Sequence, residues 1–253
     1  MILLFDIGNT HVHVGLANDR RVTRQINIPT ADWFGGKAIG RVIRFAGAKK
    51  IEGAVLCSVV PRATRVVRQA IRRLWKLQAL ELTPETLRGL GIDYPEPQTV
   101  GPDRLANAVA AKHRFGAPVV VVDFGTAVTF DIVNRAGNYA GGIIAPGLAA
   151  MTDYLHEKTA LLPKIRIREV AAVVGKNTEQ AMLIGAVHGY RGLVRELIAE
   201  LKRELRAKHL PVIATGGYAR LIASKLPEIS AVEPGLTLEG LRLTWAAARS
   251  GAG

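Results

Sequence analysis

The sequence holds a single cysteine, Cys57, so an internal disulfide is impossible. It also lacks any apolar run near the roughly 20 residues that a membrane-spanning helix needs. The first apolar run reaches Asp6 too early for the core of a signal peptide, and no basic leader precedes it. These absences exclude a disulfide scaffold, and they favour a protein of the reducing cytoplasm without a membrane partner.

Acidic residues are also in short supply. The chain carries 21 Asp and Glu against 34 Lys and Arg, which gives a net charge of +13. Such an excess favours anionic partners, and nucleotides and nucleic acids both qualify. Aromatic residues make up only 6% of the chain, and Trp75 alone lies near the densest basic stretch, residues 62–76. Because nucleic-acid surfaces usually add aromatic side chains for stacking, we interpret this stretch as the solvated face of a helix over residues 62–77. We expect no specific nucleic-acid partner, and any DNA binding should be weak and lost as salt rises.

The most informative stretch is a polar turn, Asp6-Ile7-Gly8-Asn9-Thr10, between two short apolar runs. The runs Ile2–Phe5 and His11–Gly15 read as strands, so the stretch predicts a hairpin in which Gly8 supplies the backbone freedom. Backbone N–H groups at such a turn suit phosphate oxygens, and a neighbouring carboxylate suits the divalent cation that accompanies them. Taken alone, one such turn is more often a hairpin without a ligand.

A second copy of the pattern changes this balance. Val119–Val122 leads into Asp123-Phe124-Gly125-Thr126-Ala127, and another alternating strand follows. Both copies consist of an apolar run, Asp, an apolar residue, Gly and a small residue, and each opens one half of the chain. Two such hairpins predict a clamp on the phosphates of a nucleotide.

Two further segments contribute polar groups at helix starts. Gly101-Pro102-Asp103-Arg104 precedes a clear helix over residues 105–112, where Asp103 fits the role of an N-cap. A long helix begins at Asn177 or Thr178 and carries small residues at every fourth position. That stripe, Ala181, Gly185 and Gly189, permits close packing of another helix, from the same chain or from a partner subunit.

With these motifs in place, the chain resembles type III pantothenate kinases over nearly its whole length. This family belongs to the superfamily of actin, sugar kinases and heat-shock-chaperone ATPases. The matching segments are DIGNT at 6–10, GPDR at 101–104, DFGTA at 123–127, GGIIAPG at 141–147, GKNTEQAM at 175–182, ATGG at 214–217 and LTLEGL at 236–241. Each segment is a weak signal alone, but their number and order make the resemblance specific.

The resemblance implies an α/β fold of two similar lobes of the actin-like, ribonuclease-H-like type. Each lobe is expected to hold a mixed sheet with helices, and the nucleotide is expected in the cleft between the lobes. We expect an N-terminal lobe over residues 1–115 with the first hairpin. The C-terminal lobe, residues 116–253, would hold the second hairpin, an adenosine turn at Thr215-Gly216-Gly217 and the long helix. Family members are homodimers, and the small-residue stripe suits such a contact.

The resemblance also implies an activity, the transfer of the γ-phosphoryl group of ATP to pantothenate. The product, 4′-phosphopantothenate, is the first intermediate on the route to coenzyme A. Phosphoryl transfer needs positioning, charge neutralisation and a base oriented on the attacking hydroxyl. By carry-over from the family, Asp103 is the expected general base, Asp6 the expected ligand of Mg²⁺ through water, and Asp123 the expected ligand of K⁺ or NH₄⁺. The expected ATP-binding residues are Asp6, Ile7, Gly8, Asn9, Thr10, His11, Val12, His13 and Thr126. The expected pantothenate-binding residues are Tyr94, Gly101, Pro102, Asp103, Arg104 and Thr178.

Two alternative functions remain at this stage. The first is another kinase of the superfamily with a different acceptor, and the Tyr94 and GPDR segments argue against it because they match the acceptor side. The second is a relative with an accessory role in transcription or nucleic-acid binding, which the charge of +13 makes conceivable. The presence of both Asp6 and Asp103 argues against that role.

Overall fold

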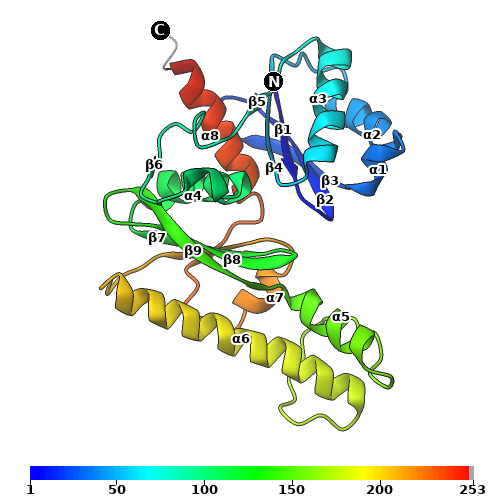
Figure 1. The fold of residues 1–253 in the computed structure, drawn as a ribbon, viewed down its shortest axis with the longest axis vertical. Coiled ribbons are helices and arrows are strands. Elements are labelled where there is room, and N and C mark those ends of the chain that lie inside the picture. Colours follow the sequence, from blue (N-terminus) through cyan, green and yellow to red (C-terminus); the bar gives the residue numbers. More distant parts are fainter. Residues whose placement is uncertain (251–253) are drawn as a thin grey trace. The chain divides into compact units, whose positions relative to one another are not determined.

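The computed structural model describes residues 1–250, and in it the chain packs into two compact units (Figure 1). Unit 1 comprises Met1–Gly116, Gly137–Ala140 and the segment that begins at Gly235. Unit 2 comprises Ala117–Ala136 and Gly141–Pro234. Among the helices of residues 1–250, none combines the length and the apolar character required to cross a membrane.

Unit 1 is built on a mixed five-stranded sheet with the order β3-β2-β1-β4-β5. β1 pairs antiparallel with β2 and parallel with β4, so the first hairpin occupies one half of the sheet. β1 and β4 consist almost entirely of buried apolar residues, as expected for central strands covered on both faces. The strand bounds are β1 Ile2–Ile7, β2 His11–Ala17, β3 Val22–Pro29, β4 Gly53–Ser58 and β5 Leu80–Glu81.

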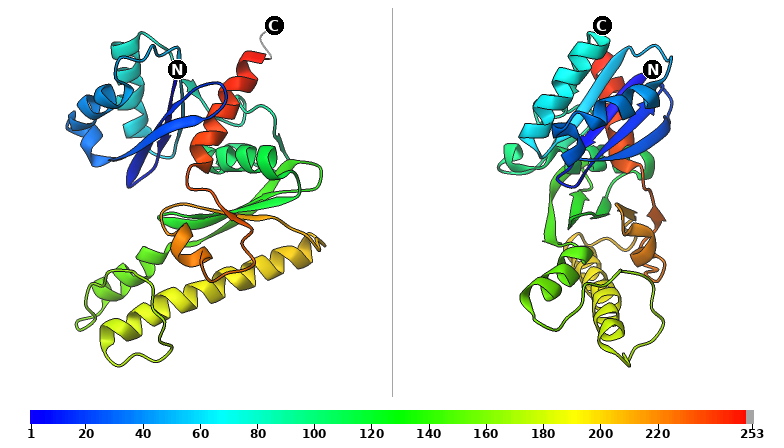
Figure 2. Two further views of the ribbon diagram at one scale, coloured as in Figure 1. Left: turned by 180° about the vertical axis from the view of Figure 1, so that it is seen from behind. Right: turned by 90° about the vertical axis from the view of Figure 1, so that its right-hand side faces the viewer.

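Helices cover both faces of this sheet (Figures 1 and 2). Alternate residues of β1, Leu3 and Phe5 among them, join a core that includes residues of α1, α2 and α3. On the other face, Leu4 approaches α8, and α8 crosses α4 at very short range. A Cβ at Gly240 would lie 2.0 Å from the carbonyl oxygen of Ala106, so only glycine permits this crossing. The helices are α1 Ala31–Phe34, α2 Lys37–Ala46, α3 Pro61–Trp75, α4 Pro102–Phe115 and α8 Leu236–Ser250.

α3 contains the basic stretch, and its arrangement agrees with the predicted amphipathic helix. The buried side is formed by Ala63, Thr64, Val67, Ala70 and Ile71. The exposed side carries Arg62, Arg65, Arg68, Arg72 and Arg73. Two of these arginines interact within unit 1: Arg62 lies 4.5 Å from the centre of the Phe34 ring, and Arg68 forms an ion pair of 3.3 Å with Glu81. The basic face is therefore solvated and partly engaged within its own unit.

Unit 1 also contains a short strand pair, one strand of which comes from the second half of the sequence. β6, Gly91–Ile92, pairs parallel with the first residues of β9, Asn138–Pro146, and the 3₁₀ helix η1, Pro97–Thr99, follows β6. Sequence analysis placed a lobe boundary between residues 115 and 116. Packing instead groups residues 137–140 and α8 with unit 1, because the former pair with β6 and the latter packs on α4.

Unit 2 contains the strands β11-β10-β7-β8-β9, in that spatial order. The second hairpin, β7 and β8, is antiparallel, and β10 and β11 extend the sheet in parallel from β7. The long helix α6 runs along this sheet, and its Tyr190 ring lies 6.4 Å from the ring of Phe124 on β7 (Figure 1). The bounds are β7 Val119–Phe124, β8 Ala127–Val133, β10 Val212–Thr215, β11 Ala231–Val232, α5 Leu148–Lys158, α6 Thr178–Glu204 and α7 Ala219–Ala223.

A buried arginine fixes the segment that leads into α6. Arg191 is 5% exposed and forms a bidentate pair with Glu169, with N–O distances of 3.0 and 2.7 Å. It also donates to the carbonyl oxygens of Leu221 and Ile222 at the end of α7. The arginine lowers the pKa of Glu169, chiefly through these hydrogen bonds. One side chain therefore ties α6, α7 and the extended segment before Thr178 together.

Candidate active site

The first hairpin has the predicted form, but glycine is needed at its turn for another reason. The N–H of Gly8 donates to the carbonyl oxygen of His11 at 3.0 Å, and Thr30 Oγ1 donates to the carbonyl oxygen of Gly8 at 2.7 Å. Gly8 is not among the glycines with a positive φ. Instead, a Cβ would lie 3.1 Å from the carbonyl oxygen of His11. Glycine is therefore favoured by the close approach of the two strand ends.

The side chains of this hairpin divide into exposed and buried groups. Asn9, Thr10 and His11 are exposed, whereas Ile7 and Val12 are fully buried in the core. Of the predicted ATP-binding residues here, Ile7 and Val12 can therefore offer a ligand only their backbone groups. His13 Nδ1–H donates a hydrogen bond of 2.7 Å to the amide oxygen of Asn27 on β3, which requires the tautomer protonated at Nδ1 or the charged ring.

A buried thiol contacts one of the two carboxylates that carry the predicted chemistry. Cys57 on β4 is the register partner of Asp6 on β1, and its Sγ–H donates to Asp6 Oδ1 at 3.5 Å. Burial raises the pKa of the Cys57 thiol well above its usual value, and the negative charges of Asp6 and Asp103 raise it further. Of the two carboxylates, Asp6 forms the hydrogen bond with this buried sulfur. Asp103 lies in the first turn of α4, and α4 packs against β4, the strand that carries Cys57.

From its place in the apolar run of residues 54–60, Cys57 is predicted to be a small buried residue, and the sequence does not link it to the site. The residue is indeed fully buried, but it also contacts the carboxylate of Asp6, a predicted site residue. Only the parallel register of β1 and β4 places it there, and the sequence carries no local signal of that register.

Asp103 is not the N-cap that sequence analysis considered. Gly101 is the N-cap of α4, and Asp103 is the second helical residue, with its Oδ1 accepting a hydrogen bond of 2.9 Å from the N–H of Arg104. Burial raises the pKa of Asp103, although the N–H and guanidinium of Arg104 act in the opposite direction. A Cβ at Gly101 would lie 2.5 Å from Asp103 Oδ1, so glycine leaves room for the carboxylate. The result is a carboxylate with increased basicity at a helix N-terminus.

Tyr94 and Arg104, which are predicted to bind pantothenate, both contact the side chain of Tyr139. The rings of Tyr94 and Tyr139 have centroids 6.2 Å apart and are nearly perpendicular. The guanidinium carbon of Arg104 lies 5.8 Å from the centre of the Tyr139 ring. Tyr94 is 38% exposed, whereas Tyr139 is 1% exposed. Sequence analysis did not select Tyr139, because it follows the second hairpin and not the GPDR segment.

Unit 2 brings the second hairpin against the predicted adenosine turn. Asp123 on β7 is the register partner of Thr215 on β10, and the turn at Gly216 follows directly. Gly216 has φ +90°, and a Cβ there would lie 2.4 Å from Asp123 Oδ1. Near Thr126, a Cβ at Gly147 would lie 2.2 Å from the Thr126 carbonyl oxygen. The lack of a side chain at these two glycines therefore allows the backbone at Gly216 to approach the Asp123 carboxylate, and the backbone at Gly147 to approach the turn of the second hairpin.

Two other places on unit 2 complete this description. Thr178 is the exposed first residue of α6, whose N-cap Asn177 accepts a hydrogen bond from the N–H of Gln180 at 2.9 Å.

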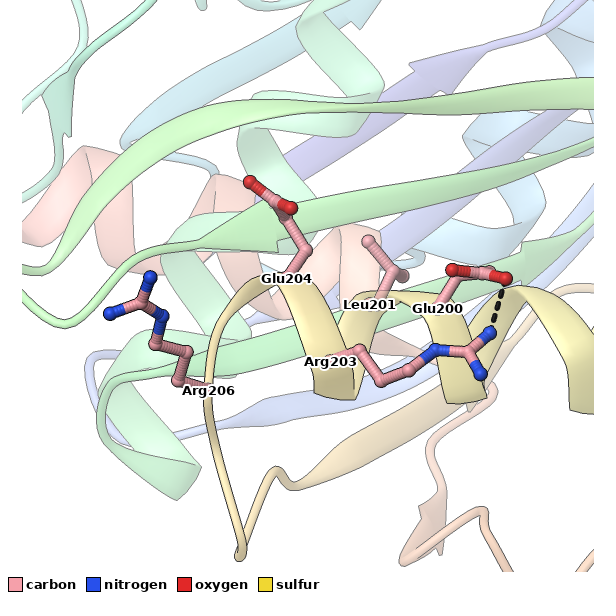
Figure 3. Close-up of a pocket in the computed structure, with 5 residues that line it drawn as sticks. All are labelled: Glu200, Leu201, Arg203, Glu204 and Arg206. Carbon is pink, nitrogen blue, oxygen red and sulfur yellow. Dashed lines mark hydrogen bonds and ion pairs between the residues drawn. The ribbon is translucent and has the colours of Figure 1, made fainter.

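An open cavity lies at the far end of the same helix and is lined by Glu200, Leu201, Arg203, Glu204 and Arg206, with Arg203 paired to Glu200 (Figure 3). No predicted site residue lines that cavity, so it is separate from the candidate active site.

The comparison with known families settles what these motifs belong to. Residues 2–200 match the model of the type III pantothenate kinase family. The chain belongs to this family. Relatives named type III pantothenate kinase include one from Methylacidiphilum infernorum, 43% identical, with 96% of this chain and 87% of the relative covered. Another, from Akkermansia muciniphila, is 44% identical, with 95% of this chain and 96% of the relative covered.

Solved structures show that the fold is the two-lobed α/β fold of actin-like kinases and ATPases. A candidate Baf family transcriptional activator from Campylobacter jejuni superposes with a TM-score of 0.60 at 19% identity, with 96% of each chain covered. A candidate N-acetylmannosamine kinase from Listeria monocytogenes gives a TM-score of 0.53 at 11% identity, with 100% of this chain and 99% of that chain covered. Type III pantothenate kinases and more distant kinases therefore share this architecture.

Proposed function

We propose that this protein transfers the γ-phosphoryl group of ATP to the primary hydroxyl of pantothenate and so forms 4′-phosphopantothenate. The observation that carries the proposal is the match to the type III pantothenate kinase family, in a chain that has Asp6 at the end of β1 and Asp103 in the first turn of α4. A kinase needs one carboxylate for the metal that accompanies ATP and one base for the attacking hydroxyl. The two carboxylates fill these two roles.

Asp103 is the proposed general base. Its raised pKa strengthens it as a proton acceptor, and its position in the first turn of α4 favours the carboxylate form at neutral pH. When the hydroxyl oxygen of pantothenate attacks the γ-phosphorus, the hydroxyl proton passes to Asp103, and ADP leaves with the electrons of the broken P–O bond. The N–H of Arg104 holds the carboxylate in place during this step.

Asp6 is the proposed Mg²⁺ residue, acting through water. A hard oxygen ligand on a rigid central strand, next to a turn with exposed polar groups, fits the metal of an ATP complex. When bound, Mg²⁺ neutralises charge on the phosphate oxygens. The thiol of Cys57 occupies one oxygen of Asp6 with a hydrogen bond. In the proposed site, Gly8 and Thr10 contribute backbone and hydroxyl donors to phosphate, together with Asn9, His11 and His13.

Arg104 and Tyr94 are the proposed acceptor residues. The planar guanidinium of Arg104 matches the pantothenate carboxylate in geometry and charge. Tyr94 is partly exposed and presents an apolar ring with a polar tip to the same region. Gly101 and Pro102 would line this site with backbone, and Thr178 would contribute a hydroxyl from the start of α6.

Unit 2 is proposed to bind the remaining nucleotide groups. Thr126 in the second hairpin would contact phosphate, and the turn at Gly216 would lie near the adenosine. Asp123 is proposed to bind K⁺ or NH₄⁺. Its carboxylate lies among backbone groups at a turn that only glycine can adopt, which suits a large, weakly hydrated cation with oxygen ligands. We place the reaction in the cytoplasm, in keeping with a chain whose single cysteine is a buried free thiol.

A direct assay tests the function. The protein is incubated with ATP, Mg²⁺, K⁺ and pantothenate, and 4′-phosphopantothenate is measured by mass spectrometry against a sample without pantothenate. We expect product formation that consumes one ATP for each product. ATP consumption that is the same with and without pantothenate, or no phosphorylated pantothenate at all, would reject pantothenate as the acceptor.

We also propose that the protein acts as a homodimer through α6. Its stripe Ala181, Gly185 and Gly189 is exposed within unit 2, and no described atom lies within 4 Å of a Cβ built at Gly185 or Gly189. Such a surface admits the close approach of a second helix.

Gly185→Leu tests this interface with two opposite effects. Leucine has the higher helix propensity, so the substitution should stabilise an isolated α6 by up to about 1 kcal/mol. In a close helix pair the added side chain should separate the subunits. We expect light scattering to give a dimer for the wild type and a larger monomer fraction for the variant at equal concentration. A variant as dimeric as the wild type would move the interface elsewhere.

A further inference from the structure

Tyr139 lies where three parts of unit 1 meet. It follows the second hairpin on β9, and it is the register partner of Ile92 on β6. Its carbonyl oxygen accepts a hydrogen bond of 2.8 Å from the N–H of Asp93, the residue before Tyr94. The backbone of Tyr139 therefore fixes the start of the loop that carries Tyr94.

Within unit 1, the start of the strand that carries Tyr139 makes close contacts with β6 and with α4. A Cβ at Gly91 would lie 2.1 Å from Asn138 Oδ1, so the β6–β9 pair is tightly packed at this point. Lys112 of α4 donates to the carbonyl oxygen of Gly89 at 3.0 Å, and its Cε would lie 2.9 Å from a Cβ at Gly137. These contacts fix the strand that carries Tyr139 next to α4, the helix that begins in the GPDR segment. Tyr139 and that segment are far apart in the sequence.

The side chain of Tyr139 contacts both proposed acceptor residues. The guanidinium of Arg104 lies 5.8 Å from the ring centre, within the range of a cation–π interaction. The Tyr94 ring meets the same side chain at an interplanar angle of 75°, in an edge-to-face arrangement. At 1% exposure, Tyr139 itself offers almost no surface to a substrate.

We propose that Tyr139 is the positioning residue of the acceptor site. Its ring restricts the guanidinium of Arg104 to a narrow range of positions, and its backbone and ring together fix Tyr94. Recognition of the acceptor carboxylate therefore depends on a buried ring that does not touch the acceptor. This inference rests on the proposed roles of Arg104 and Tyr94 in pantothenate binding.

Tyr139→Leu removes the aromatic face while keeping an apolar side chain. We expect the KM for pantothenate to rise at least about 3-fold, as for loss of a cation–π contact, with kcat and the KM for ATP within about 2-fold of wild type. Tyr139→Phe keeps the ring and should behave like the wild type. Phe45→Leu is the matched control, because it removes a ring from a second arginine pair of unit 1, with Arg24, at 5.1 Å, away from the site.

A second acceptor separates positioning from a general loss of structure. Panthenol has an alcohol in place of the pantothenate carboxylate, and its inhibition constant against pantothenate measures binding without the carboxylate contact. We expect Tyr139→Leu to lower the preference for pantothenate over panthenol at least about 3-fold. An unchanged preference, or a parallel rise in the KM for ATP, would overturn the inference. If the leucine variant does not fold, Tyr139→Met tests the same loss with a more adaptable side chain.

Arg104→Met distinguishes this inference from the proposal on which it rests. If the variant leaves the KM for pantothenate unchanged, the assigned acceptor site is wrong. If Arg104→Met raises that KM and Tyr139→Leu does not, only the role of Tyr139 is wrong. When both proposals hold, the two substitutions combined should raise the KM by less than the product of the two single effects, because Tyr139 acts in part through Arg104.

Discussion

Asp103→Asn is expected to lower kcat by about 100-fold or more, the usual cost of losing a general base. The asparagine amide has nearly the shape of the carboxylate, and its oxygen can still accept the hydrogen bond from the N–H of Arg104. What it loses is the ability to take the proton of the attacking hydroxyl. Initial rates at saturating ATP and pantothenate measure the effect. A folded variant with near-normal kcat would return Asp103 to a structural role.

The stability of the same variant provides an independent check. Because burial raises the pKa of Asp103, its ionised form is disfavoured in the folded state. The stabilising contribution of Asp103 to the free energy of unfolding is therefore fully present below the pKa of an aspartate in the unfolded chain, about 3.9. It is lost as the pH rises through the higher pKa that Asp103 has in the folded state. Asparagine does not ionise. Thermal unfolding should show Asp103→Asn at least as stable as wild type at neutral pH, with the difference fading near pH 4.

An exposed aspartate offers a matched control for this test. Asp19 lies at the turn between β2 and β3, and its side chain is exposed. Asp19→Asn removes the same charge from the chain without touching the site. We expect it to leave kcat unchanged. Equal losses in the two variants would point to net charge as the cause.

Asp123 is expected to make the enzyme depend on a monovalent cation. A carboxylate about 4 Å from nucleotide phosphates, at an effective dielectric near 20, carries a like-charge cost on the order of 4 kcal/mol. K⁺ or NH₄⁺ beside Asp123 would remove this repulsion and help to hold the nucleotide. We expect low activity in Na⁺ or Tris buffers and a rise of at least about 10-fold on adding K⁺, since part of the repulsion is screened by solvent.

Asp123→Asn should weaken the response, because the amide offers the cation no full charge. The measurement is the initial rate against KCl at constant ionic strength, for the wild type, Asp123→Asn and the control Asp19→Asn. The control should keep the wild-type response. A flat curve for the wild type would mean that Asp123 has some other purpose.

Local pattern alone determined much of this molecule. The two hairpins were predictable because alternating apolar residues flank Asp-x-Gly turns, and that signal needs only neighbours in the chain. The helix predicted over residues 62–77 is α3, Pro61–Trp75, and its basic and apolar residues fall on opposite sides as local spacing requires. The family and its reaction were predictable because seven short motifs occur in one order along the chain.

Other features required the folded chain. The reason for glycine at position 8 is visible only in the folded hairpin, because a Cβ there would lie 3.1 Å from the His11 carbonyl oxygen. Asp103 is the second helical residue of α4 and not its predicted N-cap, because the N-cap depends on where the backbone hydrogen bonds of the helix begin. The union of residues 137–140 and α8 with unit 1 depends on strand pairing and helix packing between distant segments.

Cys57 and Tyr139 show the limit most clearly. Both lie in apolar strands, and nothing near them in the sequence distinguishes them from core residues. Parallel register sets Cys57 against Asp6, and the β6–β9 pair sets Tyr139 against Tyr94 and Arg104. Register is decided by the packing of whole strands and not by single residues, so the residues that support the site became visible only in the tertiary structure.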